Sequence, residues 1–208
     1  MQIVVVFPSY IESQNFIIPR TSHTVNVLVS GVGIYNVLYR LTKYVIQNHV
    51  DLIIFSGIAG TFTTNFDITK VVCVQNDVFA DIGEWKNNTF HSLFDLGLEN
   101  PNEFPFTNKR LELPYLAVFD LFPCVSGITV NQITTTEERK NQLIDQFSAQ
   151  VETMEGAAAH YVCLQEHVPC IHVSAISNNV GERNKNKWNI SGSLNSLYKA
   201  IHLVIKNV

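Results

Sequence analysis

Two glutamates and one asparagine stand where they could do chemistry together. Glu155 lies between the apolar segment 151–153 and the small residues 156–159, Glu12 lies in a loop after the first apolar run, and Asn178 follows the last one. Paired carboxylates suit cleavage of a glycosidic bond through an oxocarbenium-like transition state, because one activates water while the other holds sugar hydroxyls. An amide both donates and accepts, so asparagine can read the edge of a polar heterocycle.

Glu155 by itself is open to a plainer interpretation. A carboxylate at a helix start is favoured by the helix dipole without any catalytic task. Gly156, however, disfavours a helix by roughly 1 kcal/mol relative to alanine, which indicates close packing of this helix against a sheet. In parallel α/β folds such strand-to-helix turns lie at the carboxyl edge of the sheet, where ligands bind.

The elements that must position these residues alternate along the chain. Apolar runs predict strands at 3–7, 25–29, 52–55, 71–79, 151–153 and 170–176, with a short strand near 90–94. Helical periodicity predicts helices at 34–49, 135–147, 155–167 and 193–205, the second of them opened by a capping box of Thr135 and Glu138. This alternation predicts one α/β domain, residues 1–208, with a mostly parallel or mixed central sheet flanked by helices.

Two glycine-containing segments, Ser30–Gly33 and Ser56–Gly60, follow predicted strands. Neither is a GxGxxG or Walker A motif, so a dinucleotide or triphosphate cradle is not indicated. They serve either as plain turns or as places where backbone approaches a ligand. The topology brings both segments, the loop 8–14 with Glu12, and Asn178 to one edge of the sheet.

Composition excludes several classes of protein. The 208 residues are 46% hydrophobic and 15% charged, and the net charge of −4 provides no basic face for nucleic acid or an anionic membrane. No apolar run approaches the ~20 residues of a membrane span. The N-terminus carries no basic leader, which predicts a cytoplasmic protein. The four cysteines lack CxxC spacing and the seven histidines lack HExxH spacing, so we expect reduced thiols, no metal and no cofactor.

Several motifs occur together in a familiar order. They are Thr153-Met154-Glu155-Gly156-Ala157-Ala158, then Ala175-Ile176-Ser177-Asn178, supported by Ser30–Gly33, Ser56–Gly60 and Ser126-Gly127. Over nearly its whole length the chain resembles the nucleoside phosphorylase/nucleosidase superfamily, and most closely its hydrolases of methylthioadenosine, S-adenosylhomocysteine and futalosine. The resemblance implies a nucleoside phosphorylase-like fold, a purine nucleoside as substrate and a homodimer.

The resemblance also implies roles for individual residues. Glu12 would activate the water, Glu155 would hold the ribose hydroxyls, and Met154 would pack under the sugar. Asn178 would stand where the adenine-specific hydrolases place an acid near purine N7. The remaining implied contacts are Val32, Ala59 and Gly60 around the sugar and water, Val130 and Asn131 flanking the base, and Trp188 beside the base.

At this position Asn178 differs from the acid of the adenine-specific hydrolases, and the difference bears on which base is bound. A neutral amide can give an N–H to a 6-oxo group or N7 while its carbonyl accepts from N1–H, which fits hypoxanthine better than adenine. Together with Val180–Arg183 (VGER) and Ser126–Asn131 (SGITVN), it makes the chain look like futalosine hydrolases, which release hypoxanthine on an alternative menaquinone route.

Other interpretations stay open. A methylthioadenosine-type or other purine nucleosidase is the nearest alternative. A phosphorylase is disfavoured because the glycine segments and the loop 8–14 contain no arginine for phosphate. A non-catalytic nucleoside-binding protein would have no use for both Glu12 and Glu155. Trp188 and Arg183 could form a surface lid, and Phe104 or Phe106 could complete the pocket of a neighbouring subunit.

Overall fold

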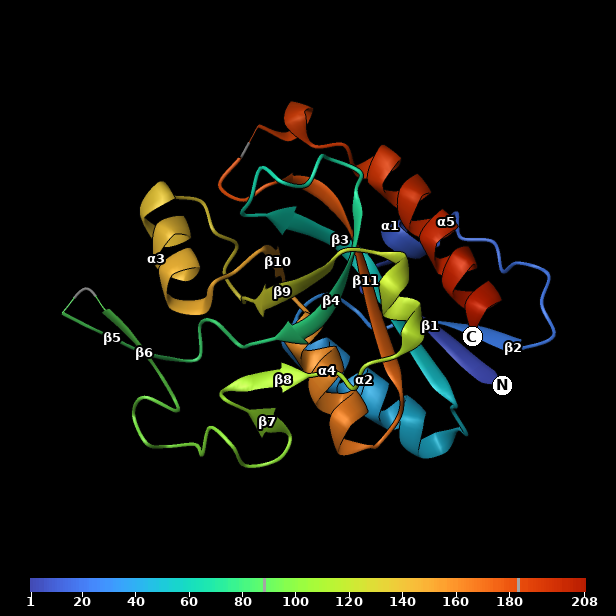
Figure 1. Ribbon diagram of the computed structural model, residues 1–208, viewed down its shortest axis with the longest axis horizontal. Coiled ribbons are helices and arrows are strands. Elements are labelled where there is room, and N and C mark those ends of the chain that lie inside the picture. The colour runs from blue at the N-terminus through green and yellow to red at the C-terminus, as the bar shows by residue number, and fades with distance from the viewer. Residues whose placement is uncertain (88, 183) are drawn as a thin grey trace.

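The computed structural model describes residues 1–87, 89–182 and 184–208, and it shows a mixed β-sheet covered by helices (Figure 1). The main sheet contains β1 (Gln2–Phe7), β2 (Thr24–Val29), β3 (Leu52–Thr61), β4 (Val71–Asp77), β7 (Phe106–Thr107), β8 (Arg110–Glu112), β9 (Cys124–Thr129), β10 (Val151–Thr153) and β11 (Cys170–Asn179). A separate hairpin of β5 (Gly83–Lys86) and β6 (Thr89–Ser92) projects from one side (Figure 1).

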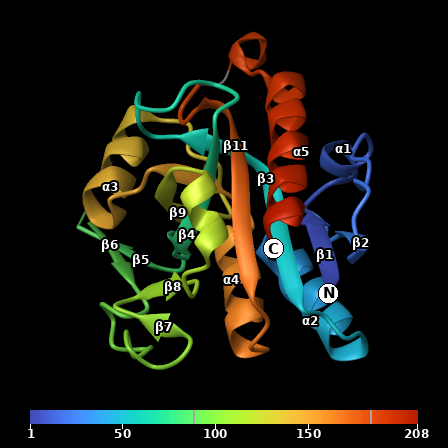
Figure 2. The ribbon, with the colours of Figure 1, turned by 45° about the vertical axis from the view of Figure 1, so that its right-hand side comes forward.

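Helices cover both faces of this sheet. They are α1 (Tyr10–Ser13), α2 (Ile34–Gln47), α3 (Glu137–Phe147), α4 (Gly156–Gln165) and α5 (Ile190–Asn207), with 3₁₀ turns η1 (Ala117–Leu121) and η2 (Lys185–Lys187). Helices α2 and α4 pack side by side on one face, and α5 covers β3 and β11 from the other (Figures 1 and 2). The chain ends lie near each other beside β1.

The strand pairings mix both directions. Strands β2, β1, β3 and β11 are parallel neighbours, whereas β10 pairs with β3 and β11 pairs with β4 in the antiparallel sense. The pairings β3–β10, β10–β9, β9–β4, β4–β11 and β11–β3 close a ring of five strands. The predicted fold class, a mixed central sheet flanked by helices, is therefore confirmed.

The core forms where the apolar runs predicted it. Residues 3–7 and 52–55 are almost fully buried because β1 and β3 are covered by helices on both faces. In α4 the small residues Ala157, Ala158 and Ala159 are all fully buried. A Cβ on Gly156 would lie 2.2 Å from Asp77 Oδ2, so only glycine fits there. The close approach of this helix to the sheet is confirmed.

Three local predictions were wrong. Ser56–Gly60 is not a turn but the second half of β3, because β11 and β10 provide hydrogen-bonding neighbours on both sides of it. The loop 8–14 contains the helical turn α1, capped by Ser9. The cap of α3 is Thr136, whose hydroxyl accepts from Arg139 N, and not Thr135 with Glu138.

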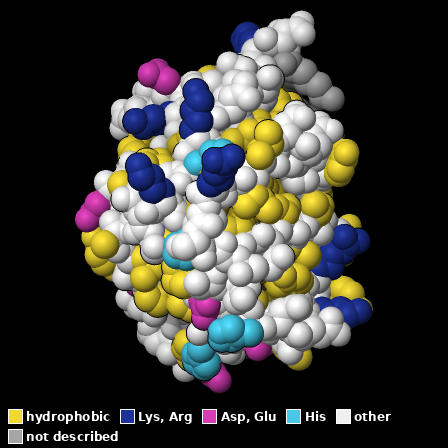
Figure 3. Space-filling view, turned by 90° about the vertical axis from the view of Figure 1, so that its right-hand side faces the viewer, with side chains coloured by type: hydrophobic (Ala, Val, Ile, Leu, Met, Phe, Trp, Pro, Cys, Tyr) yellow, Lys and Arg dark blue, Asp and Glu magenta, His cyan; other side chains and the backbone are white. Residues whose placement is uncertain are grey.

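Within the part of the chain that the structure describes, no helix is both long and apolar enough to span a bilayer. On the face that carries α5 and β2, Lys and Arg side chains are interspersed with apolar, histidine and neutral side chains (Figure 3).

Candidate functional site

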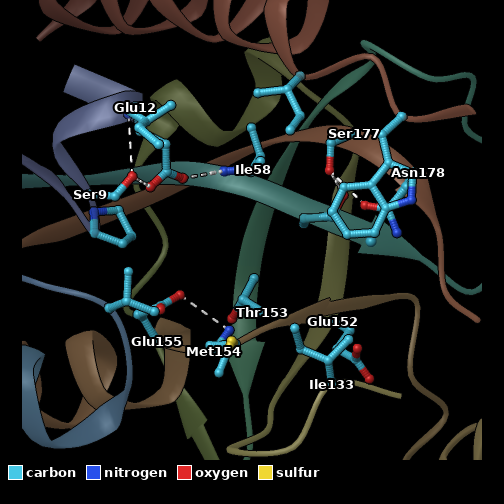
Figure 4. A pocket seen from close by; sticks show the side chains of 17 residues that line it. Ser9, Glu12, Ile58, Ile133, Glu152, Thr153, Met154, Glu155, Ser177 and Asn178 are labelled. Atoms are coloured by element: carbon cyan, nitrogen blue, oxygen red, sulfur yellow. Dashed lines mark hydrogen bonds between the residues drawn. The ribbon is translucent and has the colours of Figure 1, made fainter. Parts of the chain in front are cut away.

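A cavity of about 290 Å³ lies near the ends of β1, β3, β10 and β11 (Figure 4). Eight of the ten residues predicted for the site line it, namely Glu12, Val32, Ala59, Gly60, Met154, Glu155, Asn178 and Trp188. Glu12 and Glu155 lie at one end, which we call the carboxylate end (Figure 4). Asn178 and Glu152 lie at the other, which we call the amide end.

Glu12 is held by the short helix that follows β1. Its Oε1 accepts from Ile58 N at 3.1 Å and its Oε2 from Ser9 Oγ at 2.5 Å. The side chain is 8% exposed, and burial raises the pKa of the carboxyl, although the hydrogen bonds from Ser9 and Ile58 lower it in part. A raised pKa makes Glu12 a stronger base than an exposed glutamate.

Glu155 joins two segments that are distant in the sequence. Its Oε1 accepts from Gly33 N at 2.8 Å and its Oε2 from Met154 N at 3.2 Å. Gly33 has φ +90°, a conformation that glycine adopts without strain and that presents its N–H to the carboxylate. Burial, with a smaller effect of the Glu12 charge, raises the pKa of Glu155 to about 7, while Gly33 and Met154 oppose the shift.

The first turn of α4 is capped without the side chain of Glu155. Glu155 is the N-cap residue but makes no capping hydrogen bond, and its carboxylate turns towards the cavity instead. The hydroxyl of Thr129 accepts from Ala157 N at 2.7 Å, and that of Thr153 accepts from Gly156 N at 3.1 Å. Thr129 in turn donates to Oδ1 of the buried Asp77 at 3.0 Å.

Asn178 is oriented by its chain neighbours. Its Nδ2 donates to Asn179 O at 3.0 Å and its Oδ1 accepts from Ser177 Oγ at 2.8 Å. The register of β11 against β3 shifts between Ile176 and Asn178, so Ser177 lies in a bulge. A bulge redirects side chains, and here it brings the Asn178 amide into the cavity. One hydrogen on Nδ2 and one lone pair on Oδ1 remain for a ligand.

Two predicted residues lie outside the cavity lining. Val130 is fully buried beneath the site, and its N–H donates to Thr153 O. Asn131 is exposed because Asp81 accepts hydrogen bonds from both its N–H and its Nδ2. Asp81 is far away in the sequence, so the sequence did not reveal this partner.

The structure adds residues that the sequence did not indicate. Ile133 and Glu152 line the amide end, and Ile11 and Ile190 also contribute to the wall. Only the presence of a charged residue inside a predicted strand could have drawn attention to Glu152. Trp188 lines the cavity and donates from Nε1 to Glu182 O at 2.9 Å. Arg183, expected beside it in a lid, lies outside the described residues.

The described lining carries three carboxylates, those of Glu12, Glu152 and Glu155, and no Lys, Arg or His. Among residues 1–87, 89–182 and 184–208, no group of three or more His, Cys, Asp or Glu side chains could hold a metal ion. The arrangement can therefore bind hydroxyl and N–H donors and can accept a proton, whereas an anion would meet like charge.

Sequence similarity to curated relatives extends over most of the chain. Futalosine hydrolase of Thermus thermophilus is 27% identical over 191 residues, which cover 86% of this chain and 80% of that protein. Futalosine hydrolase of Acidothermus cellulolyticus is 29% identical over 185 residues, covering 87% and 75%. Aminodeoxyfutalosine nucleosidase of Helicobacter pylori strain J99 is 25% identical over 162 residues, covering 76% and 68%. These likenesses support the prediction of an N-glycosyl hydrolase enzyme.

Solved structures share the fold. A Helicobacter pylori methylthioadenosine nucleosidase mutant with 5′-methylthioadenosine in its active site aligns with a TM-score of 0.83 at 19% identity, covering 100% of this chain and 99% of that one. The futalosine hydrolase structure of Helicobacter pylori strain 26695 aligns with a TM-score of 0.82 at 19% identity, covering 100% and 98%. The model of the phosphorylase superfamily matches residues 5–206, so this chain belongs to the phosphorylase superfamily.

Proposed function

We propose that the protein is a nucleoside hydrolase that cleaves the N-ribosidic bond of futalosine, giving hypoxanthine and dehypoxanthinyl futalosine for menaquinone biosynthesis. The observation that carries the proposal is one cavity with two buried carboxylates at one end and the neutral amide of Asn178 at the other. The curated relatives named futalosine hydrolase support the choice of nucleoside.

The carboxylate end performs the cleavage in this proposal. Glu12 takes a proton from water, the water oxygen bonds to C1′, and the bond from C1′ to the base nitrogen breaks. The electron pair of that bond passes into the purine, which takes up a proton from solvent, and Glu12 returns the proton it took from water to solvent. Glu155 accepts hydrogen bonds from the ribose hydroxyls, and Met154 contacts the sugar. Backbone N–H groups hold both carboxylates before substrate binds, so little reorganisation is needed.

The amide end selects the base. Asn179 O fixes the Nδ2 of Asn178, whose second hydrogen is available to a 6-oxo oxygen or to N7. Hypoxanthine carries an acceptor at position 6 and a donor at position 1, and adenine carries the reverse. A buried polar group left unpaired costs about 1–3 kcal/mol, so this end favours futalosine over methylthioadenosine.

We also propose a homodimer, in which Phe104 or Phe106 completes the partner's cavity. Several apolar side chains at and near the rim are exposed, among them Ile11 at 62%, Val32 at 47% and Tyr35 at 72%. Tyr39 continues this surface along α2 at 67% exposure. A second copy of the chain would bury these side chains and close the carboxylate end.

Released base from a panel of nucleosides tests the function. Futalosine, methylthioadenosine, S-adenosylhomocysteine and inosine are incubated with the protein, with and without phosphate. We expect hypoxanthine from futalosine at the same rate in phosphate-free buffer. A strict need for phosphate would indicate a phosphorylase instead. Binding by calorimetry without any released base would indicate a nucleoside-binding protein.

A further inference from the structure

Glu152 is a carboxylate in the cavity wall that the cleavage step does not use. It is 8% exposed and lies at the amide end, away from Glu12 and Glu155 (Figure 4). A buried acid inside a three-residue strand is costly unless it is hydrogen-bonded, so its presence calls for a partner or a ligand.

The strand register places Glu152 opposite Asn178. Gly60 of β3 pairs with Glu152 of β10 on one side and with Asn178 of β11 on the other. Directly paired residues project on the same face of a sheet, and neighbouring strands lie about 4.8 Å apart. The backbones of Glu152 and Asn178 are therefore about 10 Å apart across a position that has no side chain.

Gly60 lines the cavity between the strands that carry these two side chains. A Cβ at this position would lie 3.4 Å from Asn178 Nδ2 and 3.0 Å from Val180 Cγ2, so it would occupy the floor beside the amide. Without it, a flat ring can lie over the backbone of Gly60, with one edge towards Asn178 and the other towards Glu152.

Glu152 has acceptor capacity to spare. Thr134 supplies both of its hydrogen bonds, from N to Oε1 at 3.2 Å and from Oγ1 to Oε2. A carboxylate offers about four acceptor sites, so about two remain for a ligand. Burial raises the pKa of Glu152, whereas the bonds from Thr134 and the charge of Arg139 lower it. Thr134 is itself buried and fixes the carboxylate in place.

We propose that Glu152 is a specificity-determining residue, which accepts a hydrogen bond from the N1–H of a 6-oxopurine that lies over Gly60 with its other edge at Asn178. This inference rests on the proposed function, and it states which residue binds each edge of the purine base. Asn178 Oδ1 already accepts from Ser177, so Glu152 is the better acceptor for N1–H. An adenine would present the N1 lone pair to the carboxylate, and the two acceptors would repel each other.

Binding of free bases tests this assignment without relying on turnover. Calorimetry is performed with hypoxanthine, 1-methylhypoxanthine and adenine on the wild-type protein, Glu152→Gln and Glu138→Gln. The last variant is a matched control, since it removes the same charge from an exposed position on α3. Glutamine keeps the size of Glu152 and can both donate and accept.

We expect the wild-type protein and Glu138→Gln to bind hypoxanthine about 10- to 100-fold more tightly than they bind 1-methylhypoxanthine or adenine. This ratio is the usual effect of one hydrogen bond to a charged group. In Glu152→Gln the ratio of hypoxanthine to adenine affinity should fall at least about tenfold. Equal binding of hypoxanthine and 1-methylhypoxanthine, an unchanged ratio in Glu152→Gln, or no binding of any base would overturn the inference. Failure of the proposed function would show separately, as absence of base release from nucleosides.

Discussion

The two ends of the cavity are built in different ways. At the carboxylate end, the backbone N–H groups of Ile58, Gly33 and Met154 supply three of the four hydrogen bonds to the acids, and Ser9 Oγ supplies the fourth. At the amide end, the hydroxyls of Thr134 and Ser177 supply two of the four hydrogen bonds to Glu152 and Asn178, and the bulge at Ser177 orients the Asn178 amide. Backbone donors depend only weakly on the identity of the side chain, whereas a bulge or a hydroxyl is altered by a single substitution.

Under the proposed function, this difference separates catalysis from selection of the base. Groups that stabilise a transition state must be fixed before the substrate arrives, and backbone amides are the most rigid donors available. Selection among bases requires only that a few polar groups match or mismatch. We therefore expect substitutions at the carboxylate end to lower the turnover of all nucleosides and substitutions at the amide end to change the ratio between them.

The largest effect is expected at the carboxylate end. Glu12→Gln and Glu155→Gln should each lower kcat on the order of 10²–10⁴-fold, the usual contribution of a general acid–base group. Glutamine keeps the shape and the hydrogen bonds from Ile58 or Gly33, so folding should survive. Steady-state kinetics on futalosine give kcat.

Circular dichroism and a thermal melt serve as the control for these two variants. If a folded variant turned over futalosine at nearly the wild-type rate, the carboxylate in question would have only a structural role.

At the amide end, Asn178→Asp should alter selectivity more than turnover. An aspartate can accept from the 6-amino group of adenine but cannot donate to a 6-oxo group. The ratio of kcat/KM for futalosine to kcat/KM for methylthioadenosine should fall at least about tenfold, because the substitution replaces one matched hydrogen bond to the 6-oxo base by a mismatch. Comparable kcat/KM for the two nucleosides in the wild-type protein would leave only a general purine nucleosidase.

The fold was predictable where burial determines the pattern. The runs at 3–7, 52–55 and 170–176 are apolar without alternation because helices cover both faces of their strands, and each forms a strand. The errors arose where long-range pairing overrides local preference. Ser56–Gly60 has the composition of a turn, yet β10 and β11 draw it into β3.

The site was predictable where a motif coincides with a structural junction. Glu155 was indicated by the small residues after it, and Glu12 by its place after β1. Glu152 was missed because its only sequence signal is a charge inside the short predicted strand 151–153, which belongs to no motif. Asn131 was expected at the base, but its hydrogen bonds with Asp81, 50 positions away, keep it outside.

A smaller effect, on stability, is expected beneath the carboxylate end. Asp77 is fully buried, its Oδ2 has no hydrogen-bond partner, and burial raises its pKa to about 7. Between its ordinary pKa of 3.8 and about 7, the folded protein holds a proton that the unfolded chain releases, so this group lowers stability as pH rises. Asp77→Asn, which does not titrate, should remove this loss of stability at higher pH.

The gain in the free energy of unfolding of Asp77→Asn over wild type should grow from near zero at pH 4 to on the order of 1–4 kcal/mol above pH 7. Urea unfolding across this pH range measures it. Because Asp77 does not line the cavity, kcat should change far less than in the Glu155 variant. A constant difference in stability at every pH would show that Asp77 does not titrate in this range.

The smallest effect is expected where a second subunit would close the carboxylate end. Phe104 is 56% exposed and stacks on His167 with ring centroids 5.6 Å apart. Phe106 instead packs against Phe94 and Tyr161 within the same chain. Phe104→Ala should therefore raise KM by roughly 3- to 10-fold, as the loss of one aromatic contact predicts, with little change in Tm.

Phe106→Ala is the matched control. Its ring is less exposed than that of Phe104 and packs on both Phe94 and Tyr161, so its loss should lower Tm while leaving KM nearly unchanged. Sedimentation velocity gives the oligomeric state of both variants and of the wild type. A dimer with KM raised only by Phe104→Ala would show that the carboxylate end is completed in trans by an exposed side chain. A fully active monomer would rule this out, because the rim of Ile11 and Val32 would then remain open to solvent during catalysis.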